Sequence, residues 1–206
     1  LSQGENNMFN ALLISTGAIV GIVVAVVAVI LVIALVGWWI SMGNALIRLK
    51  NKVEEAWATI DVFLKKRYDL IPNLVETVKG YSKHESETLQ NVIAARSSAM
   101  SAKTPEAKMA AEKEFSGSIR TFISAVSEAY PDLKANANFL DLQNQLKGIE
   151  SELESARRYY NGTVKAFNIK IEVFPSSIVA NSKRYEKKPY FELDSAEERK
   201  NVKVQF

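Results

Sequence analysis

The sequence has no cysteine and a single histidine among its 206 residues. Without cysteine the chain forms no disulfide, holds no thiolate zinc site and carries no lipid anchor on a cysteine. His84 lies in KHESE beside Glu85 and Glu87. This spacing matches neither an HExxH metalloprotease motif nor two imidazoles on one helical face. Because a metal site needs several converging ligands, we expect no metal and no other cofactor.

Motifs of catalysis are lacking as well. No G-x-S-x-G turn and no glycine-rich phosphate loop occurs, and a serine triad would have to recruit His84 as its base. The 26 Lys and Arg residues are interspersed with 23 Asp and Glu residues, and the net charge is +3. This pattern favours a solvated surface and gives no indication of nucleic-acid binding. The sequence therefore predicts a protein that is not an enzyme.

Charge is missing from one long stretch, because no charged residue occurs between Glu5 and Arg48. Within it, residues 18–40 (AIVGIVVAVVAVILVIALVGWWI) are apolar throughout. As a helix these residues span roughly 34 Å, enough to cross a hydrocarbon core of about 30 Å. A cleavable secretory signal would have a basic N-terminal region and a shorter apolar run. We expect a retained membrane helix over residues 17–43, preceded by a short extracytoplasmic segment, residues 1–16.

The residues that flank this helix predict its orientation. Arg48, Lys50 and Lys52 follow it, whereas no basic residue precedes it. The positive-inside rule places the N-terminus outside and the C-terminal part in the cytoplasm. Trp38 and Trp39 then lie where an interfacial aromatic belt is expected.

Small residues recur every four positions near the start of the span, at Gly17, Gly21 and Ala25. A strip of this kind lets two helices approach closely in lipid, and we name these three residues as candidates for packing between membrane helices. Small residues are also common in membrane helices that do not pair, so the alternative stays open.

Residues 44–175 show helical periodicity. A first helix runs to a stop at Gly80, a second covers roughly residues 84–102, and a third begins with Thr104 as N-cap and Pro105 in its first turn. The third ends before Pro131, and a long fourth helix ends at Phe174–Pro175. The apolar residues on these faces, which we expect to form the core, are Leu46, Leu49, Val53, Ala56, Trp57, Ile60, Leu64, Ile71, Leu74, Val75, Val78, Leu89, Val92, Ile93, Met100, Phe115, Ile119, Phe122, Ile123, Val126, Phe139, Leu142, Leu146, Ile149, Leu153, Ala156, Tyr160, Val164, Phe167, Ile171 and Phe174.

The predicted fold class is all-α. It consists of the membrane helix, an antiparallel bundle of three or four long helices over residues 44–175, and an irregular charged tail over residues 176–206. The repeat of the last helix is close to 3.5 residues, which is typical of helices that pack at shallow angles in bundles and coiled coils. The final NVKVQF alternates in character and could add a strand to a partner's sheet.

Polar residues of the last helix admit two interpretations. Glu150, Glu152, Glu154, Arg157 and Arg158 form a charge-rich face, and we expect such a face to be solvated. Neutral polar residues stand beside apolar positions, and they could be buried hydrogen-bond partners or part of an interface: Asn136, Gln143 and Gln145.

Pro72 stands inside the first helical run of the bundle, in RYDLIPNLVETV. A proline there removes one backbone hydrogen bond and clashes with the preceding turn, at a cost of roughly 3 kcal/mol. The sequence thus raises the question of what makes the helix tolerate it.

Three stretches together resemble the LemA family of bacterial membrane proteins. They are KNKVEEAWATIDVFLKKRYDLIPNLVETVKGYSKHE, YPDLKANANFLDLQNQLKGIESELESARRYYNGTVKAFNIKIEVFP, and KPYFEL near the end. The resemblance implies a single N-terminal membrane helix in the bacterial inner membrane and a cytoplasmic helical bundle. Family members are linked to membrane-embedded heat-shock zinc proteases, relatives occur in magnetosome membranes, and no enzymatic activity is established for the family.

The resemblance also singles out residues for a structural or interface role: Asp61, Arg67, Asp69, Pro72, Asn73, Asn136, Gln143, Arg157, Tyr160 and Asn161. One hypothesis is that Pro72 kinks the first helix while Asp69 or Arg67 meets the last helix near Asn136, Gln143 or Arg157. The competing interpretation is that Pro72 merely bends the helix around a core.

Two functions follow as expectations. The first is a non-enzymatic scaffold or adaptor of the inner membrane that forms homo-oligomers, with the lipid bilayer and other inner-membrane proteins as partners. The second is an accessory subunit that regulates a membrane-embedded zinc metalloprotease or delivers substrates to it.

Overall fold

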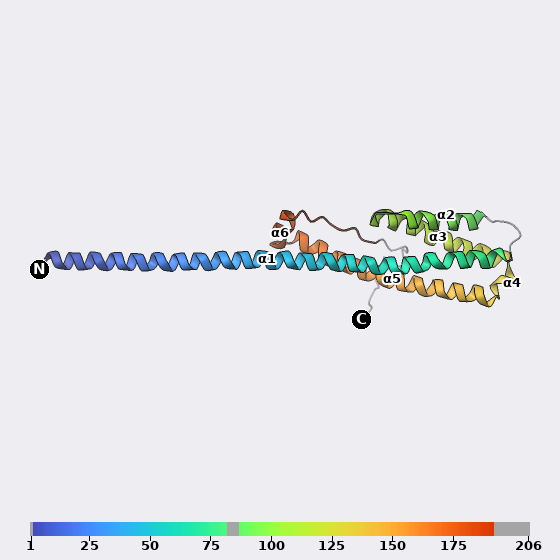
Figure 1. Cartoon of the computed structure of the whole chain (residues 1–206), viewed down its shortest axis with the longest axis horizontal. Coiled ribbons are helices and arrows are strands. Elements are labelled where there is room, and N and C mark those ends of the chain that lie inside the picture. Colours follow the sequence, from blue (N-terminus) through green and yellow to red (C-terminus); the bar gives the residue numbers. More distant parts are fainter. Residues whose placement is uncertain (1, 82–86, 192–206) are drawn as a thin grey trace, which may run out of the picture. The chain divides into compact units, whose positions relative to one another are not determined.

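The computed structural model describes residues 2–81 and 87–191, with side chains described from residue 18 onward. In this part of the chain the elements are α1 (Ser2–Lys79), α2 (Glu87–Ser101), α3 (Pro105–Ala129), α4 (Pro131–Lys134), α5 (Ala137–Glu172) and α6 (Ser176–Ser182) (Figure 1). The same described residues contain no strand. The predicted all-α class is confirmed. His84 and NVKVQF lie outside the described residues.

Helix boundaries fall at the signals that the sequence supplies. Helix α1 ends immediately before Gly80. Thr104 caps α3, since its Oγ1 accepts a hydrogen bond from the Ala107 amide at 3.2 Å, and Pro105 occupies the first turn. Helix α3 ends before Tyr130–Pro131 because proline disfavours a helical conformation in the preceding residue.

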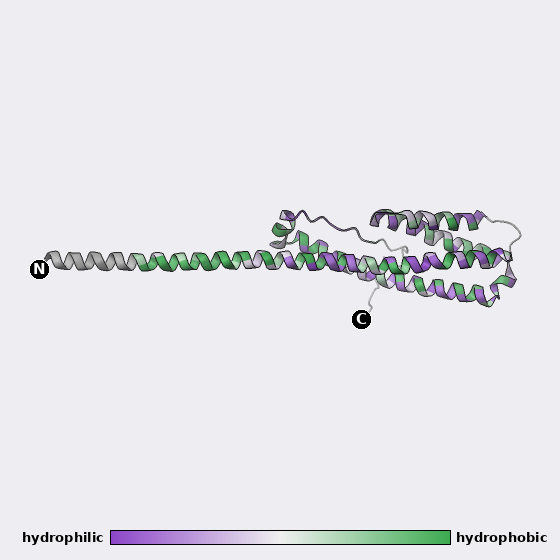
Figure 2. Cartoon of the chain, in the orientation of Figure 1, coloured by the Kyte–Doolittle hydropathy of each residue, from purple (hydrophilic) through white to green (hydrophobic). Residues whose placement is uncertain are grey.

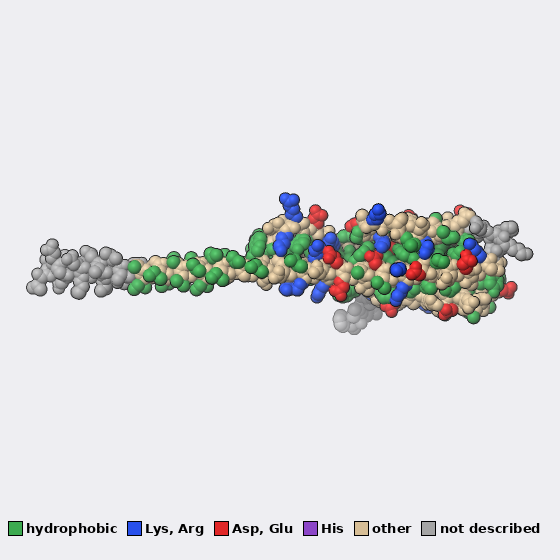
Figure 3. Space-filling model, in the orientation of Figure 1, with side chains coloured by type: hydrophobic (Ala, Val, Ile, Leu, Met, Phe, Trp, Pro, Cys, Tyr) green, Lys and Arg blue, Asp and Glu red, His purple; other side chains and the backbone are tan. Residues whose placement is uncertain are grey.

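The chain divides into two compact units. The first unit contains residues 1–48 and 170–185. Its part of α1 is the one helix among the described residues that is long and apolar enough to cross a membrane (Figure 2). None of the described side chains in this apolar window is buried, which distinguishes it from the core helix of a soluble protein. Figure 3 shows no Lys, Arg, Asp or Glu side chain along it.

The second unit contains residues 49–169 and 186–206. Within it α1 and α5 lie antiparallel and in register. Trp57 packs edge-on against Tyr160, Arg67 bonds to Glu150, and Tyr81 bonds to Asn136. Between successive contacts the residue number increases on the α1 side by as much as it decreases on the α5 side, as expected for antiparallel helices in register. Helices α2 and α3 pack against each other beside this pair (Figure 1).

Most residues expected in the core are buried, among them Ile60, Leu64, Phe115, Phe139 and Phe167. The expectation was wrong for three residues, since the side chains of Ile93, Met100 and Phe174 are 45%, 52% and 81% exposed. In α2 the buried face is instead formed by Leu89, Val92 and Ala99. Ile93 and Met100 each follow a buried residue, Val92 or Ala99, by about 100° of helix rotation, and they lie at the edge of the buried face that Leu89 borders.

The segment after Pro175 differs from the expected irregular tail. Residues 176–182 form α6, which buries Ser176, Val179 and Ala180. Residues 186–191 belong to no helix, and we call them the C-terminal strap. The strap belongs to the second unit, where it lies along α5.

Candidate functional site

Helix α1 continues through Pro72, whose side chain is exposed. Because proline has no amide hydrogen, the carbonyl of Tyr68, four residues earlier, has no helical partner. Arg96 of α2 supplies one, since its Nε donates to the Tyr68 carbonyl oxygen at 2.8 Å. The proline thus creates an acceptor that joins α1 to α2, and this contact offsets part of its cost.

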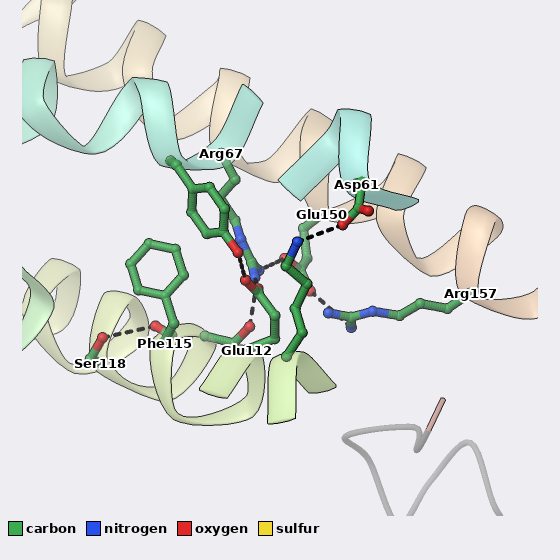
Figure 4. A network of polar contacts seen from close by, with 10 residues as sticks. Asp61, Arg67, Glu112, Phe115, Ser118, Glu150 and Arg157 are labelled. Atoms are coloured by element: carbon green, nitrogen blue, oxygen red, sulfur yellow. Dashed lines mark hydrogen bonds and ion pairs between the residues drawn. The ribbon is translucent and has the colours of Figure 1, made fainter. Parts of the chain in front are cut away.

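A network of charged groups crosses the bundle at the residue before Tyr68 (Figure 4). Arg67 is its centre. One terminal nitrogen, Nη1, donates to Ser116 Oγ at 2.9 Å and to Glu150 Oε2 at 2.8 Å, and Nη2 pairs with Glu112. The Tyr68 hydroxyl donates to the other oxygen of Glu112. The network therefore ties α1 to both α3 and α5.

Arg67 and Glu112 are 2% and 0% exposed. Burial of a charge is costly unless it is paired and hydrogen-bonded, and this pair satisfies both conditions. The ring of Phe115 covers one face of the guanidinium, with the Arg67 Cζ 5.2 Å from the ring centre. Burial, followed by the contact with the Glu112 carboxylate, raises the pKa of Tyr68 well above its ordinary value.

Glu150 extends this network along α5 to Arg157, whose Nη1 lies 3.7 Å from Glu150 Oε1. The expectation of a solvated charged face was therefore wrong for Arg157, which is buried. The expectation was right for Glu150, Glu152 and Arg158, which are exposed, although the Glu150 oxygens also face Arg67 and Arg157. The sequence pattern did not reveal that the opposing helices carry complementary charges at this level.

Two asparagines of α5 hold the C-terminal strap through its main chain. The Asn161 side chain donates to the Phe191 carbonyl at 2.9 Å and accepts from the Phe191 amide at 2.8 Å. Asn168 makes the same pair of bonds with Lys188, both at 2.9 Å. Each amide side chain thus pairs with a strap residue as a neighbouring β-strand would.

The spacing of these residues explains the register. Asn161 and Asn168 are two helical turns apart, a rise of about 10.5 Å. Lys188 and Phe191 are three residues apart, which is about 10 Å for an extended chain. The two repeats match, so both asparagines can pair with the strap at once, and the strap runs antiparallel to α5.

Aromatic residues complete the docking of the strap. Tyr160 donates its hydroxyl to the Pro189 carbonyl at 3.0 Å. Trp57 contacts both the Tyr160 ring and the Phe191 ring, with centroids 5.4 Å and 6.1 Å apart. The Arg157 guanidinium lies over the Phe191 ring, with its Cζ 4.6 Å from the ring centre. Burial, assisted by the negative charge of Glu106, raises the pKa of Tyr160 to about 12.

Beside the strap lies an open pocket of about 420 Å³. Its walls come from α3, α5 and the strap: Glu106, Met109, Ala110, Lys113, Arg157, Pro189, Tyr190 and Phe191. Within the described part of the chain no three His, Cys, Asp or Glu side chains converge as metal ligands. The chemistry that this region offers is ion pairing and main-chain recognition.

The residues that the family resemblance singled out fall into two groups. Four of them meet in the network and at the strap, namely Arg67, Arg157, Tyr160 and Asn161. The others lie apart: Asp61 pairs with Lys108 at 2.8 Å, Asn136 accepts from the Asn138 and Phe139 amides at the start of α5, Gln143 is half-buried, and Asp69, Pro72 and Asn73 are exposed.

The sequence suggested that Asp69 or Arg67 contacts the last helix of the bundle, α5. Arg67 reaches α5 at Glu150, which then contacts Arg157. Asp69 faces solvent. Of the candidates for membrane-helix packing, Gly21 and Ala25 are exposed, and Gly17 lies before the residues whose side chains are described.

Residues of the site that were not predicted include Glu112, Glu150 and Asn168. Signals for two of them exist in the sequence. Glu112 stands three residues before Phe115 and seven before Ile119, so it is a charge on an apolar helix face. Asn168 repeats Asn161 after seven residues, on the same face of its helix.

A sequence model of the LemA family matches residues 56–206. The chain is also similar to "Protein LemA" of Metamycoplasma hominis, with 28% identity over 142 residues, or 69% of this chain. The aligned region is 65% of that relative's length, so less than two thirds of the relative is covered.

Proposed function

The chain belongs to the LemA family, and on this premise we propose that it is a non-enzymatic scaffold or adaptor of the bacterial inner membrane that self-assembles. Its N-terminus is outside the cell membrane and its bundle is in the cytoplasm. The proposal goes beyond family membership, and it depends on how the membrane segment and the bundle are joined.

The observation that carries it is the extent of α1. One helix, Ser2–Lys79, contains both the apolar segment and the first long helix of the bundle, with no break between them. Arg48, Lys50 and Lys52 follow the apolar segment directly, and this supports the cytoplasmic placement of the bundle. A protein that anchors a helical bundle in this way, without a linker, is suited to holding partners at a membrane.

Self-assembly is supported by the small residues of the span. A Cβ added at Gly21 would meet no atom within 4 Å, and Ala25 is exposed on the same side of the helix. This side is therefore free of contacts within the chain, and in lipid such a strip favours close approach of a second helix.

The test is the mass of the detergent-extracted complex after mild crosslinking in the membrane. A defined multiple of the 22.9 kDa chain is expected. A monomeric particle without partners would refute the proposal. A mass that requires a second protein would instead favour the accessory-subunit function, with a membrane zinc metalloprotease as the first protein to look for.

A pair of glycine variants separates helix pairing from general damage to the span. Gly21→Leu should lower the yield of crosslinked oligomer if copies pack on this side. Gly37→Leu is the matched control, because Gly37 also has nothing within 4 Å and lies about 160° around the helix from Gly21. Equal yields for both variants would exclude the glycine strip as the contact.

A further inference from the structure

The most exposed large apolar side chain among the described residues is Phe174, at 81%. It lies at the turn between α5 and α6, in the first unit. Val173 and Ile178 beside it are 45% and 48% exposed. Exposure of these apolar side chains to water is unfavourable. A contiguous exposed apolar patch indicates a surface that contacts another molecule or a membrane.

Two backbone acceptors at this turn are satisfied by a side chain of the turn itself. The Ser176 hydroxyl lies within hydrogen-bonding distance of the Lys170 carbonyl at 2.7 Å and of the Val173 carbonyl at 3.0 Å. These are carbonyls at the end of α5, which would otherwise need water. Val179 and Ala180 bury the other side of α6 within the unit. Fewer backbone acceptors of the turn are therefore left bare when it enters an apolar environment.

The position of α6 along α1 is given by Lys183, which directly follows it. A Cβ built on Gly43 would lie 3.0 Å from Lys183 Nζ. Gly43 is three residues beyond Ile40, the last residue of the apolar run, and this is a helix rise of about 4.5 Å. The headgroup layer on each side of a bilayer is about 5–8 Å thick. The ammonium group of Lys183 thus lies at headgroup depth when residues 18–40 span the hydrocarbon core.

Charge around this segment is consistent with that depth. Lys183 and Arg184 directly follow α6, and Arg48 lies on α1 in the same unit. Figure 3 shows hydrophobic side chains over the α6 region on the side toward the span, with Lys and Arg side chains next to them. An apolar edge bordered by basic side chains is the pattern of a segment that lies in the membrane surface.

We propose that residues 173–184 form an interfacial membrane contact, in which Phe174 and Ile178 enter the acyl boundary while Lys183 and Arg184 bind anionic lipid headgroups. This inference rests on the membrane anchoring proposed above. The chain then contacts the bilayer through two segments that are about 130 residues apart in the sequence, the apolar part of α1 and residues 173–184.

Because the chain has no cysteine, a single introduced thiol can carry a nitroxide spin label for the test. The variants are Phe174→Cys and Ile178→Cys in the full-length chain, reconstituted in vesicles of phosphatidylcholine and phosphatidylglycerol. Val29→Cys in the span and Val62→Cys on α1 of the second unit are controls, since both side chains are exposed. The readout is the accessibility of each label to oxygen, which concentrates in lipid, relative to a water-soluble nickel chelate.

The labels at 174 and 178 should show an oxygen-to-nickel ratio several-fold above that at 62 and closer to that at 29. Labels at 174 and 178 that match 62, while 29 reports lipid, would overturn the interfacial contact and leave the anchor intact. A label at 29 that reports water would overturn the anchor as well. The Ile178 variant keeps Phe174 in place, so a negative result cannot be assigned to loss of the phenylalanine.

Vesicles of phosphatidylcholine alone test the basic residues. The ratio at 178 should fall when the anionic lipid is omitted. In a Lys183→Gln, Arg184→Gln background the ratio should no longer depend on the anionic lipid. An unchanged ratio in the absence of phosphatidylglycerol would overturn the role given to Lys183 and Arg184.

Discussion

Replacing Arg96 by methionine should destabilise the bundle only while Pro72 is present. Methionine keeps much of the aliphatic bulk of arginine but cannot donate to the Tyr68 carbonyl, which Arg96 Nε reaches at 2.8 Å. A hydrogen bond from a charged donor contributes about 1.5–3 kcal/mol. Because Arg96 is only half-buried, water can replace part of that, and we expect a loss of about 1–2 kcal/mol.

The second change is Pro72→Ala. Pro72 is exposed, so alanine leaves no cavity, and its amide can bond to the Tyr68 carbonyl as in any helix. Proline costs about 3 kcal/mol relative to alanine inside a helix, so Pro72→Ala should stabilise the bundle. In that background Arg96→Met should cost less than about 0.5 kcal/mol, because the carbonyl has its helical partner. The coupling between the two sites is then about 1 kcal/mol.

Thermal unfolding of the full chain in mild detergent, followed by circular dichroism at a helix band, measures these effects. For a chain of this size 1 kcal/mol corresponds to about 2–4 °C in Tm, so Arg96→Met should lower Tm by roughly 2–8 °C in the native background. Arg120→Met, at an exposed arginine of α3, is the control and should change little. If Arg96→Met lowers Tm equally with and without Pro72, Arg96 does not serve the carbonyl that the proline leaves free.

Three further predictions concern the network and the strap. Glu112→Leu leaves the buried Arg67 without its main partner and should cost about 3–5 kcal/mol, seen as a Tm loss that Arg67→Met partly restores; a double variant no more stable than the single one would contradict this. Asn168→Ala removes two main-chain bonds to Lys188, together about 2 kcal/mol, so trypsin cleavage of the Lys187–Lys188 bond should accelerate roughly 30-fold; the bond after Lys188 is resistant because Pro189 follows it. Asn144→Ala, at an exposed position of α5, should leave the rate unchanged. The pKa of Tyr160 is raised to about 12 from 10.0, so the folded chain holds the hydroxyl proton more tightly than the unfolded chain does. The resulting contribution to the free energy of unfolding is complete below pH 10 and is lost as the pH rises from about 10 to about 12. Tm measured across that range should fall less steeply in Tyr160→Phe, and identical slopes would show that Tyr160 is not responsible.

The helices themselves are set by local properties of the sequence. The uncharged run of residues 18–40 predicts the span because any backbone in hydrocarbon must satisfy its own hydrogen bonds. Thr104–Pro105 and Tyr130–Pro131 predict the ends of α3 because capping and proline geometry involve only neighbouring residues. The apolar stripe of α5 likewise predicts which of its faces is buried.

Local properties do not say which helix covers a face or how completely. Ile93 and Met100 have the same apolar character as the buried residues of α2, yet they are exposed. Phe174 continues the apolar stripe of α5 but lies past the end of the helix, and its side chain is exposed.

Arg67, Arg96, Glu150 and Asn161 show what only the tertiary structure decided. Each is polar, and its sequence neighbourhood allows a solvated position as readily as a buried one. Its role depends on a partner at least 28 residues away in sequence, such as the Tyr68 carbonyl for Arg96. The sequence by itself determined the span, the helices and most of their buried faces, because these depend on neighbouring residues and on transfer from water. The antiparallel register of α1 and α5 decided which charges meet and where the strap docks, because ion pairs and hydrogen bonds act only between groups that the fold brings within about 3 Å.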